Sequence, residues 1–324
     1  MRGLSSLVAG ACVLVVAGVA MAAEKWDMPT AYPDGNYHTQ NARRFAECVK
    51  TGTGGELEIV VHSGGSLFKG NDIKRAVQTG QVPIGERLLS AHENENPIFG
   101  FDAVPFLATS YEQSEKLWQA ARPVLEDVLA EQNLVLLYSV PWPPQGLYTK
   151  KPLTSAADMK GVKFRAYNAA TARLAELMGA QPVQIEAAEL AQALATGVAE
   201  SFISSGSTGY DTKVWEHLTH FYDVQAWLPR NSVIVNRQAW EGLGEPVRNV
   251  LRACAGMAEL SGTKWSEALA NWYLQQLAAH GMKVQPPGEQ LAADFRKIGE
   301  TMTAEWLAKT GERGRRILDR YRGG

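Results

Sequence analysis

An arginine between a predicted strand and a predicted helix is the residue in this sequence best suited to bind an anion. Arg165 ends an extended segment and is followed by Tyr167, Asn168 and a helix-like stretch from Ala169. In open α/β sheets, ligands bind beyond the carboxyl ends of strands, where the next helix offers unpaired N–H groups. A planar guanidinium can hold both oxygens of a carboxylate. We therefore expect Arg165 to bind a carboxylate; the competing interpretation is an ion pair with a surface acid.

Polar residues near Arg165 extend this candidate site. Ser204 and Ser205 follow a strand predicted over 198–203, which should end at the same rim of the sheet. Their hydroxyls can hydrogen-bond to a ligand, although an ordinary polar loop has the same composition. Asn168 is a good N-cap, which is an alternative to ligand contact. We include Tyr167, Asn168, Ser204 and Ser205 as candidate binding residues.

A proline-rich segment over 140–149 carries three further candidates, Trp142, Gln145 and Tyr148. Its prolines and aromatic rings can wall a pocket, and they can equally fix a crossover between two lobes. The residues alone favour neither interpretation.

The N-terminal half supplies Tyr37, Glu86 and Arg87 as additional candidates, because they lie in loops after predicted elements. Their chemistry is suited to hydrogen bonding and to charge pairing. They would complete a site formed from both halves of the chain.

Motifs of common enzyme classes are absent from the sequence, which has no G-x-S-x-G, H-E-x-x-H, C-x-x-C, G-x-G-x-x-G or Walker-type motif. His217 and His220 are three residues apart but have no evident third metal ligand, so we interpret them as ordinary surface histidines. The acidic pairs Glu93/Glu95 and Glu186/Glu189 are interpreted as solvated. We expect no catalytic residue, no metal site and no cofactor.

The elements that position these residues alternate between strand and helix, which favours an α/β fold. After residue 245 the chain becomes mainly helical, with apolar residues three and four positions apart, as in long packed helices. About 300 residues exceed what one core usually serves. The extended segments are 57–61, 162–165, 182–185 and 198–203, and the helical ones are 41–50, 71–78, 169–178 and 186–196.

The first 22 residues have the pattern of a cleaved secretory signal peptide. Arg2 precedes an apolar run over 7–19, and small residues up to Ala22 mark a plausible cleavage site. The run is short for a membrane span, and no comparable stretch follows. We expect an exported periplasmic protein that does not itself span the membrane.

Net charge and cysteine content narrow the class further. The net charge of −2 becomes −3 when Arg2 is removed with the signal peptide, which argues against nucleic acid as a partner. Cys48 and Cys254 remain in the mature chain. Export would permit a disulfide between them, and two free buried thiols are an equal alternative.

An ordered set of segments resembles the DctP-type solute-binding proteins of tripartite ATP-independent periplasmic (TRAP) transporters. The resemblance extends over essentially the whole mature chain. The segments that carry it are 32–33, 76–80, 101–107, 151–153, 158–165, 178–182 and 189–198.

This resemblance implies a two-lobed Venus-flytrap fold with long helices between the lobes. It places residues 23–145 mainly in an N-terminal lobe, 146–235 mainly in a C-terminal lobe, and 236–324 in helices that pack across both. It also implies that Arg165 grips the carboxylate of a small organic acid, and that TRAP membrane subunits receive the ligand. An ABC-type binding protein and a periplasmic enzyme acting on a carboxylate are the alternatives.

Two departures from the family pattern bear on the ligand. Ser204 stands where the family often has asparagine, and Gln145 stands near the position of a further arginine in some dicarboxylate and sugar-acid binders. Because Gln145 is uncharged, the cation that would bind a second ligand carboxylate is missing at this position, which argues for a monocarboxylate. Trp142, Tyr148 and Tyr167 favour an apolar or aromatic substituent, so the resemblance suggests an aromatic or branched 2-oxo or 2-hydroxy acid.

Overall fold

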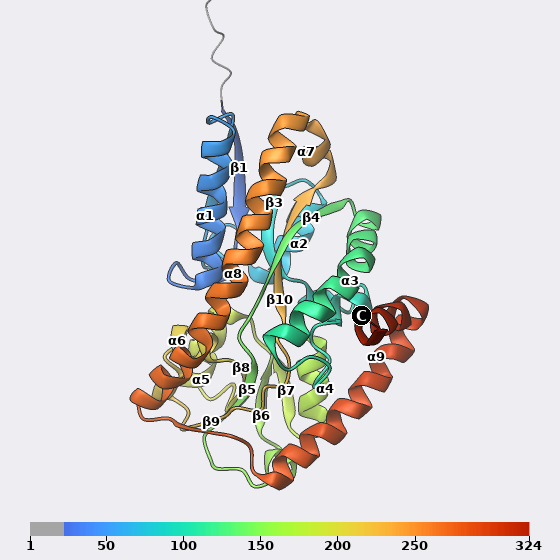
Figure 1. The fold of residues 1–324 in the computed structure, drawn as a ribbon. Helices are drawn as coiled ribbons and strands as arrows, with labels where there is room; N and C mark the ends of the chain where they lie inside the picture. The colour runs from blue at the N-terminus through green and yellow to red at the C-terminus, as the bar shows by residue number, and fades with distance from the viewer. Residues whose placement is uncertain (1–22, 324) are drawn as a thin grey trace, which may run out of the picture.

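The computed structural model describes residues 23–323, which form two lobes with long helices running between them (Figure 1). The expected signal peptide, residues 1–22, lies outside the described residues. The expected two-lobed α/β fold is confirmed by this arrangement.

The first lobe contains a parallel pair, β1-β2, and a three-stranded antiparallel sheet ordered β3-β10-β4. Its strands are β1 (Glu24–Pro29), β2 (Leu57–His62), β3 (Ile84–Leu88), β4 (Leu134–Pro141) and β10 (Arg230–Asn236). Most of β10 falls in the 146–235 segment that the sequence division assigns mainly to the second lobe. This strand returns to the first lobe because its buried residues pair with β3 and β4 on either side.

The second lobe is built on one mixed sheet ordered β11-β9-β5-β8-β6-β7. The parallel neighbours β8, β6 and β7 end at the same rim, which is where ligands bind in sheets of this kind. Its strands are β5 (Gln145–Thr149), β6 (Lys163–Ala166), β7 (Gln181–Gln184), β8 (Ser201–Ser205), β9 (His220–Tyr222) and β11 (Lys283–Gln285).

Helices surround the sheets of both lobes, and two long ones link the lobes (Figure 1). The 35-residue helix α8, about 50 Å long at 1.5 Å per residue, contacts α1 and β4 in the first lobe and α6 and β11 in the second. The helices are α1 (Tyr37–Gly52), α2 (Gly70–Gln78), α3 (Tyr111–Glu131), α4 (Ala169–Leu177), α5 (Leu190–Ala195), α6 (Gly206–Asp211), α7 (Arg237–Gly242), α8 (Glu245–Ala279) and α9 (Glu289–Gly323).

Two helices differ from the sequence expectation. The helix expected over 186–196 begins later, because residues 187–189 form a separate 3₁₀ turn before α5. Helix α9 changes direction at Gly311, whose φ of 56° is a conformation that glycine adopts without a steric penalty.

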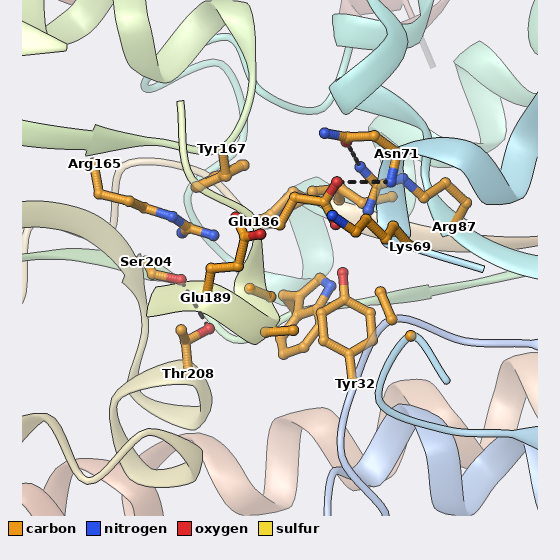
Figure 2. A pocket seen from close by; sticks show the side chains of 18 of the residues that line it. Tyr32, Lys69, Asn71, Arg87, Arg165, Tyr167, Glu186, Glu189, Ser204 and Thr208 are labelled. Atoms are coloured by element: carbon orange, nitrogen blue, oxygen red, sulfur yellow. Dashed lines mark hydrogen bonds between the residues drawn. The ribbon is translucent and has the colours of Figure 1, made fainter. Parts of the chain in front are cut away.

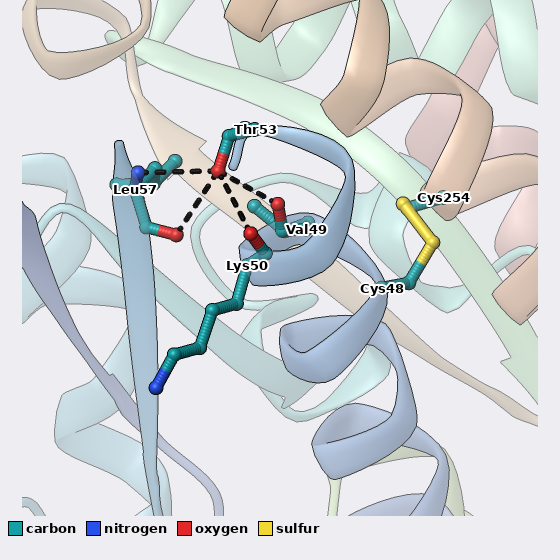
Figure 3. Close-up of a disulfide and its surroundings, with 6 residues drawn as sticks. All are labelled: Cys48, Val49, Lys50, Thr53, Leu57 and Cys254. Carbon is teal, nitrogen blue, oxygen red and sulfur yellow. Dashed lines mark hydrogen bonds between the residues drawn. A yellow bond between two sulfur atoms is a disulfide. The ribbon is translucent and has the colours of Figure 1, made fainter. Parts of the chain in front are cut away.

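A disulfide joins Cys48 of α1 to Cys254 of α8, with 5.9 Å between their Cα atoms (Figure 3). The structure thus decides between the two alternatives that the sequence left open. The bridge fixes the crossing helix α8 to the first lobe.

Two chain crossings between the lobes run side by side. The segment 142–145 leads from β4 to β5, and the segment 226–229 leads back toward β10. Their backbones are hydrogen-bonded at three points: from Trp142 N to the Pro229 carbonyl (2.7 Å), from Gln145 N to the Trp227 carbonyl (2.9 Å), and from Ala226 N to the Gln145 carbonyl (3.0 Å). This paired strap connects the two lobes, and it forms the floor between them.

Candidate functional site

A cavity of about 240 Å³ lies above this strap, between the two lobes. Residues from both lobes and from both crossings line it, as expected for a ligand held by closure. The side chains discussed below belong to Tyr32, Lys69, Asn71, Arg87, Trp142, Gln145, Arg165, Tyr167, Gln184, Glu186, Glu189, Ser204 and Thr208.

Arg165 reaches the cavity from the end of β6, as the sequence predicts. Its Nε donates to the carbonyl of Ile185 (2.9 Å), which fixes the direction of the side chain. The residue is 3% exposed, and its guanidinium lies 5.1 Å from the centre of the Tyr167 ring. Burial lowers the pKa of Arg165 to about 10, so the group stays protonated at neutral pH. In residues 23–323, its terminal nitrogens have no protein acceptor and can serve a bound anion.

The cavity floor is a hydrogen-bonded chain of side chains from the strap and from Tyr167, the residue after β6. The Tyr167 hydroxyl donates to Gln145 Oε1 (3.2 Å) and accepts from Trp227 Nε1 (3.1 Å), while Gln145 Nε2 donates to the carbonyl of Pro143 (2.9 Å). The amide of Gln145 is therefore occupied by protein partners. It holds the Tyr167 ring beneath Arg165.

Two aromatic residues form an apolar wall of the cavity on the first-lobe side. The rings of Tyr32 and Trp142 meet edge to face, with 4.8 Å between their centres. Trp142 Nε1 (2.9 Å) and the Tyr32 hydroxyl (3.4 Å) both donate a hydrogen bond to Asn231 Oδ1. Asn231 on β10 thus sets the position of both rings.

Arg87 enters the same cavity from β3 of the first lobe. Its side chain is 6% exposed and donates to Asn71 Oδ1 and to His92 Nε2. Burial lowers the pKa of Arg87, and the nearby Tyr32 hydroxyl and then the carboxylate of Glu186 oppose this effect. The structure therefore supplies a second cation, which the sequence argument from Gln145 did not anticipate.

Six predicted residues thus line the cavity: Trp142, Gln145, Arg165, Tyr167, Ser204 and Arg87. Ser204 ends β8, and its hydroxyl donates to Thr208 Oγ1 (2.8 Å). Figure 2 shows Arg165 and Ser204 approaching from the second lobe and Arg87 from the first.

The other five predicted residues lie outside the cavity lining, and each has a structural role. Tyr37 donates to the carbonyl of Pro141 (2.7 Å), and Glu86 is buried beside His38 (3.5 Å). Tyr148 stacks on Phe202, with 4.4 Å between ring centres.

Asn168 and Ser205 act as N-caps. Asn168 Oδ1 accepts from the Thr171 N–H of α4 (2.8 Å), and Ser205 Oγ accepts from the Thr208 N–H of α6 (3.4 Å). Asn168 Nδ2 also donates to Ser90 Oγ of the first lobe (3.0 Å). The capping role that the sequence offered as the alternative for Asn168 is the one the structure shows.

Sequence reasoning missed several residues of the cavity, notably Glu186 and Glu189. The pair was expected to be solvated; both residues line the cavity, where Glu189 is exposed as expected and Glu186 is half-buried. Glu186 lies two residues after the end of β7, so the strand-end rule that selected Arg165 would also have selected it. Tyr32, Lys69 and Asn71 lie in first-lobe loops that no strand-end rule identifies.

A second contact between the lobes surrounds Glu93. This first-lobe residue lies beside the N-terminus of α4 and near Lys309 of α9, in a separate cavity of about 410 Å³. Burial raises the pKa of Glu93 from its ordinary 4.5 to about 7, although Lys309 and the Ala170 N–H favour the charged form. The carboxyl group is thus partly protonated at neutral pH.

Glu93→Gln is expected to stabilise the protein at pH 8 and to leave it unchanged near pH 4.5. With its pKa raised on folding, the native state binds this proton more tightly than the unfolded state, so the contribution of Glu93 falls as pH rises from 4.5 to 7. Allowing for partial exposure, we expect about 1–2 kcal/mol. Urea unfolding of the wild type and the variant at pH 4.5 and pH 8 measures the difference in their free energies of unfolding. An equal difference at the two pH values would contradict the prediction.

Among residues 23–323, no group of three or more His, Cys, Asp or Glu side chains is arranged to hold a metal ion. In the same part of the chain, none of the helices has the length and apolar character needed to cross a membrane.

Comparison with known proteins agrees with this geometry. Residues 29–310 match the family model described as bacterial extracellular solute-binding protein, family 7 (DctP). A TRAP solute-binding protein from an unidentified marine microbe, specific for pyroglutamate and solved with co-purified pyroglutamate, is 56% identical. It covers 94% of this chain and 100% of its own, with a TM-score of 0.93.

Two further relatives are informative. DctP6 of Bordetella pertussis, solved as a receptor binding pyroglutamic acid, is 47% identical over 93% of this chain and 100% of its own, with a TM-score of 0.91. A monocarboxylate 2-oxoacid-binding periplasmic protein of Nostoc sp. is 24% identical over 88% of this chain and 80% of its own. The chain belongs to family 7 of the bacterial extracellular solute-binding proteins, the DctP family, and is a TRAP solute-binding protein.

Proposed function

We propose that this protein captures pyroglutamate in the periplasm through Arg165 and delivers it to the membrane subunits of a TRAP transporter. The observation that carries the proposal is a buried guanidinium with free donors in a cavity of about 240 Å³. The solved relatives at 56%, 47% and 46% identity, each of which binds pyroglutamate, support this ligand.

The chemistry of pyroglutamate suits the lining of the cavity. The ligand is a five-membered lactam with one carboxylate, and Arg165 can hold that carboxylate through two parallel hydrogen bonds. The CH₂ groups of the ring suit the apolar wall of Tyr32 and Trp142. The lactam N–H and C=O need an acceptor and a donor, which Ser204 and Thr208 supply at the same end as Arg165.

Ligand binding and lobe closure are coupled by the charge of Arg165. In an open cleft the guanidinium is hydrated, whereas closure without an anion leaves a buried cation unmatched, which costs several kcal/mol. A carboxylate removes this cost. The paired strap at 142–145 and 226–229 lets the lobes move as units, and the closed form would then be the form that the membrane subunits recognise.

A 2-oxo monocarboxylate is the second candidate ligand. The Nostoc relative, named for binding such acids, favours it, as do the aromatic residues in the lining. Aromatic or branched 2-oxo acids therefore belong in any binding screen beside pyroglutamate.

Calorimetry and thermal unfolding of the purified mature protein test the proposal. Pyroglutamate at a hundredfold excess over its Kd should add about 2.7 kcal/mol of stability, raising Tm by roughly 5–10 °C. The neutral lactam 2-pyrrolidinone, which lacks the carboxylate, should bind at least a hundredfold more weakly. Tight binding of 2-pyrrolidinone, or no response to pyroglutamate, would refute the proposal. Recovery of unchanged pyroglutamate after long incubation would distinguish a receptor from an enzyme.

A further inference from the structure

We infer that Glu186 restricts the cavity to acids with one carboxylate, because its own carboxylate occupies the position that a second ligand carboxylate would take. The inference rests on the proposed function and deepens it, since it defines which organic acids the Arg165 cavity admits.

Glu186 reaches across the cleft to the start of α2. It belongs to the second lobe, and its Oε1 accepts from the backbone N–H of Asn71 in the first lobe (3.3 Å) (Figure 2). A β-carbon placed on Gly70 would lie 2.9 Å from Glu186 Oε2 and 3.0 Å from Arg87 Nη1. The carboxylate of Glu186, the first turn of α2 and the guanidinium of Arg87 therefore meet at one point.

This point has the character of an anion site. The first N–H groups of a helix are unpaired and carry partial positive charge. The N-cap residue of α2 is Lys69, whose side chain makes no capping hydrogen bond, so Glu186 supplies the acceptor that the helix lacks. Arg87 adds a full positive charge beside it.

The two hydrogen-bond partners of Arg87 carry no charge. Asn71 is neutral, and burial lowers the pKa of His92 to about 4, so His92 is neutral as well. Glu186 is the leading carboxylate acting on Arg87, with a smaller contribution from Asp72. The second cation of the cavity thus already has a carboxylate of the protein near it, on the far side of Gly70.

The charges of the whole lining agree with one bound monoanion. Lys69, Arg87 and Arg165 contribute three positive charges, and Glu186 and Glu189 contribute two negative ones, so the lining carries a net charge of +1 (3 − 2 = 1). A monocarboxylate brings this sum to zero. A dicarboxylate would place its second negative charge against Glu186, and close like charges disfavour binding strongly.

Removing Glu186 is therefore expected to open the cavity to dicarboxylates. Calorimetry at pH 7.5 with pyroglutamate, glutarate and 2-oxoglutarate gives the affinity for each dicarboxylate relative to pyroglutamate. We expect this ratio to rise at least about tenfold in Glu186→Ala, where both charge and bulk are removed, and about threefold to tenfold in Glu186→Gln. Circular dichroism verifies that each variant is folded.

Glu189→Gln is the matched control, because it removes one negative charge from an exposed side chain of the same cavity, where solvent screens the charge and there is no bond to α2. Its ratio should change less than about threefold. An unchanged ratio in both Glu186 variants, an equal rise in Glu189→Gln, or a wild type that binds glutarate as tightly as its best monocarboxylate would each overturn the inference. Failure of the wild type to bind pyroglutamate would instead overturn the proposed function, and the ratio would then be taken against its tightest monocarboxylate.

Discussion

Arg165→Ala is expected to weaken pyroglutamate binding at least a hundredfold. Removing one partner of a buried, hydrogen-bonded ion pair costs about 2–5 kcal/mol, because the remaining charge is left unmatched in the closed cavity. Arg165 is 3% exposed and already held in place by the carbonyl of Ile185, so little ordering remains to be done when the carboxylate arrives. Isothermal titration calorimetry measures the loss directly.

Two comparison variants separate charge from geometry. Arg165→Lys keeps the charge but loses the fork that binds two oxygens, so we expect an intermediate loss of about tenfold to a hundredfold. Lys163→Ala removes a cation from an exposed position on the same strand, where its ammonium bonds to the carbonyl of Gly197. Its affinity should stay within about threefold of the wild type. Near-normal binding by Arg165→Ala would show that another group holds the carboxylate.

The unliganded Arg165→Ala protein carries independent information. In the closed form, burial makes the free guanidinium costly, as its lowered pKa indicates. Removing it should leave the Tm of the free protein unchanged or higher, while abolishing the rise in Tm on adding pyroglutamate. A free variant that unfolds well below the wild type would show instead that Arg165 mainly supports the fold.

The sequence predicted the fold and the place of Arg165 in the cavity lining, because both depend on local order. Arg165 lies near the end of a short strand and precedes a capped helix, and this pattern alone places it at the sheet rim. Ser204 was found by the same reasoning at the end of β8. Alternating strands and helices, together with the segments resembling the DctP family, indicated two lobes.

The other residues of the cavity depend on which surfaces of the two lobes face each other. Asn71 and Glu186 are 115 residues apart, and their contact exists because closure brings the start of α2 to the end of β7. Tyr148 shows the opposite error, since an aromatic residue near the strap looks suited to a ligand but points into the packing of the second lobe against Phe202. Side chains alternate between the two faces of a strand, so the first residue of the strand decides whether Tyr148 faces the cavity or the packed interior. The proline-rich segment before it conceals where that strand begins.

The cation argument was incomplete for the same reason. Gln145 does stand in the lining without a charge, yet Arg87 brings a second guanidinium from the other lobe. The expectation of a monocarboxylate is kept as a proposal on different grounds, namely that the carboxylate of Glu186 already lies at the start of α2 near Arg87. The net charge of a cleft can be counted only when the residues of both of its walls are known, and the sequence does not show which residues face each other across it.

Replacing both Cys48 and Cys254 with alanine is expected to lower the free energy of unfolding by about 3–5 kcal/mol and Tm by roughly 10 °C. The bridge spans 206 residues, so its loss frees a long loop of the unfolded chain, and chain entropy favours the unfolded state accordingly. The loop contains both crossings of the strap and every strand of the second lobe except β11. Urea and thermal unfolding, with and without a reductant, measure the effect.

Measuring ligand affinity separates a stabilising role of the disulfide from a role in ligand binding. Neither cysteine lines the cavity, and the bridge joins α1 to the part of α8 that packs in the first lobe, so the pyroglutamate affinity of the folded double variant should stay within about threefold of the wild type. Reductant should reproduce the loss of stability in the wild type and change nothing further in the variant. A variant as stable as the oxidised wild type would contradict the entropic argument. A variant that folds well but binds weakly would show that the bridge, by fixing α8 to one lobe, also controls how the lobes close.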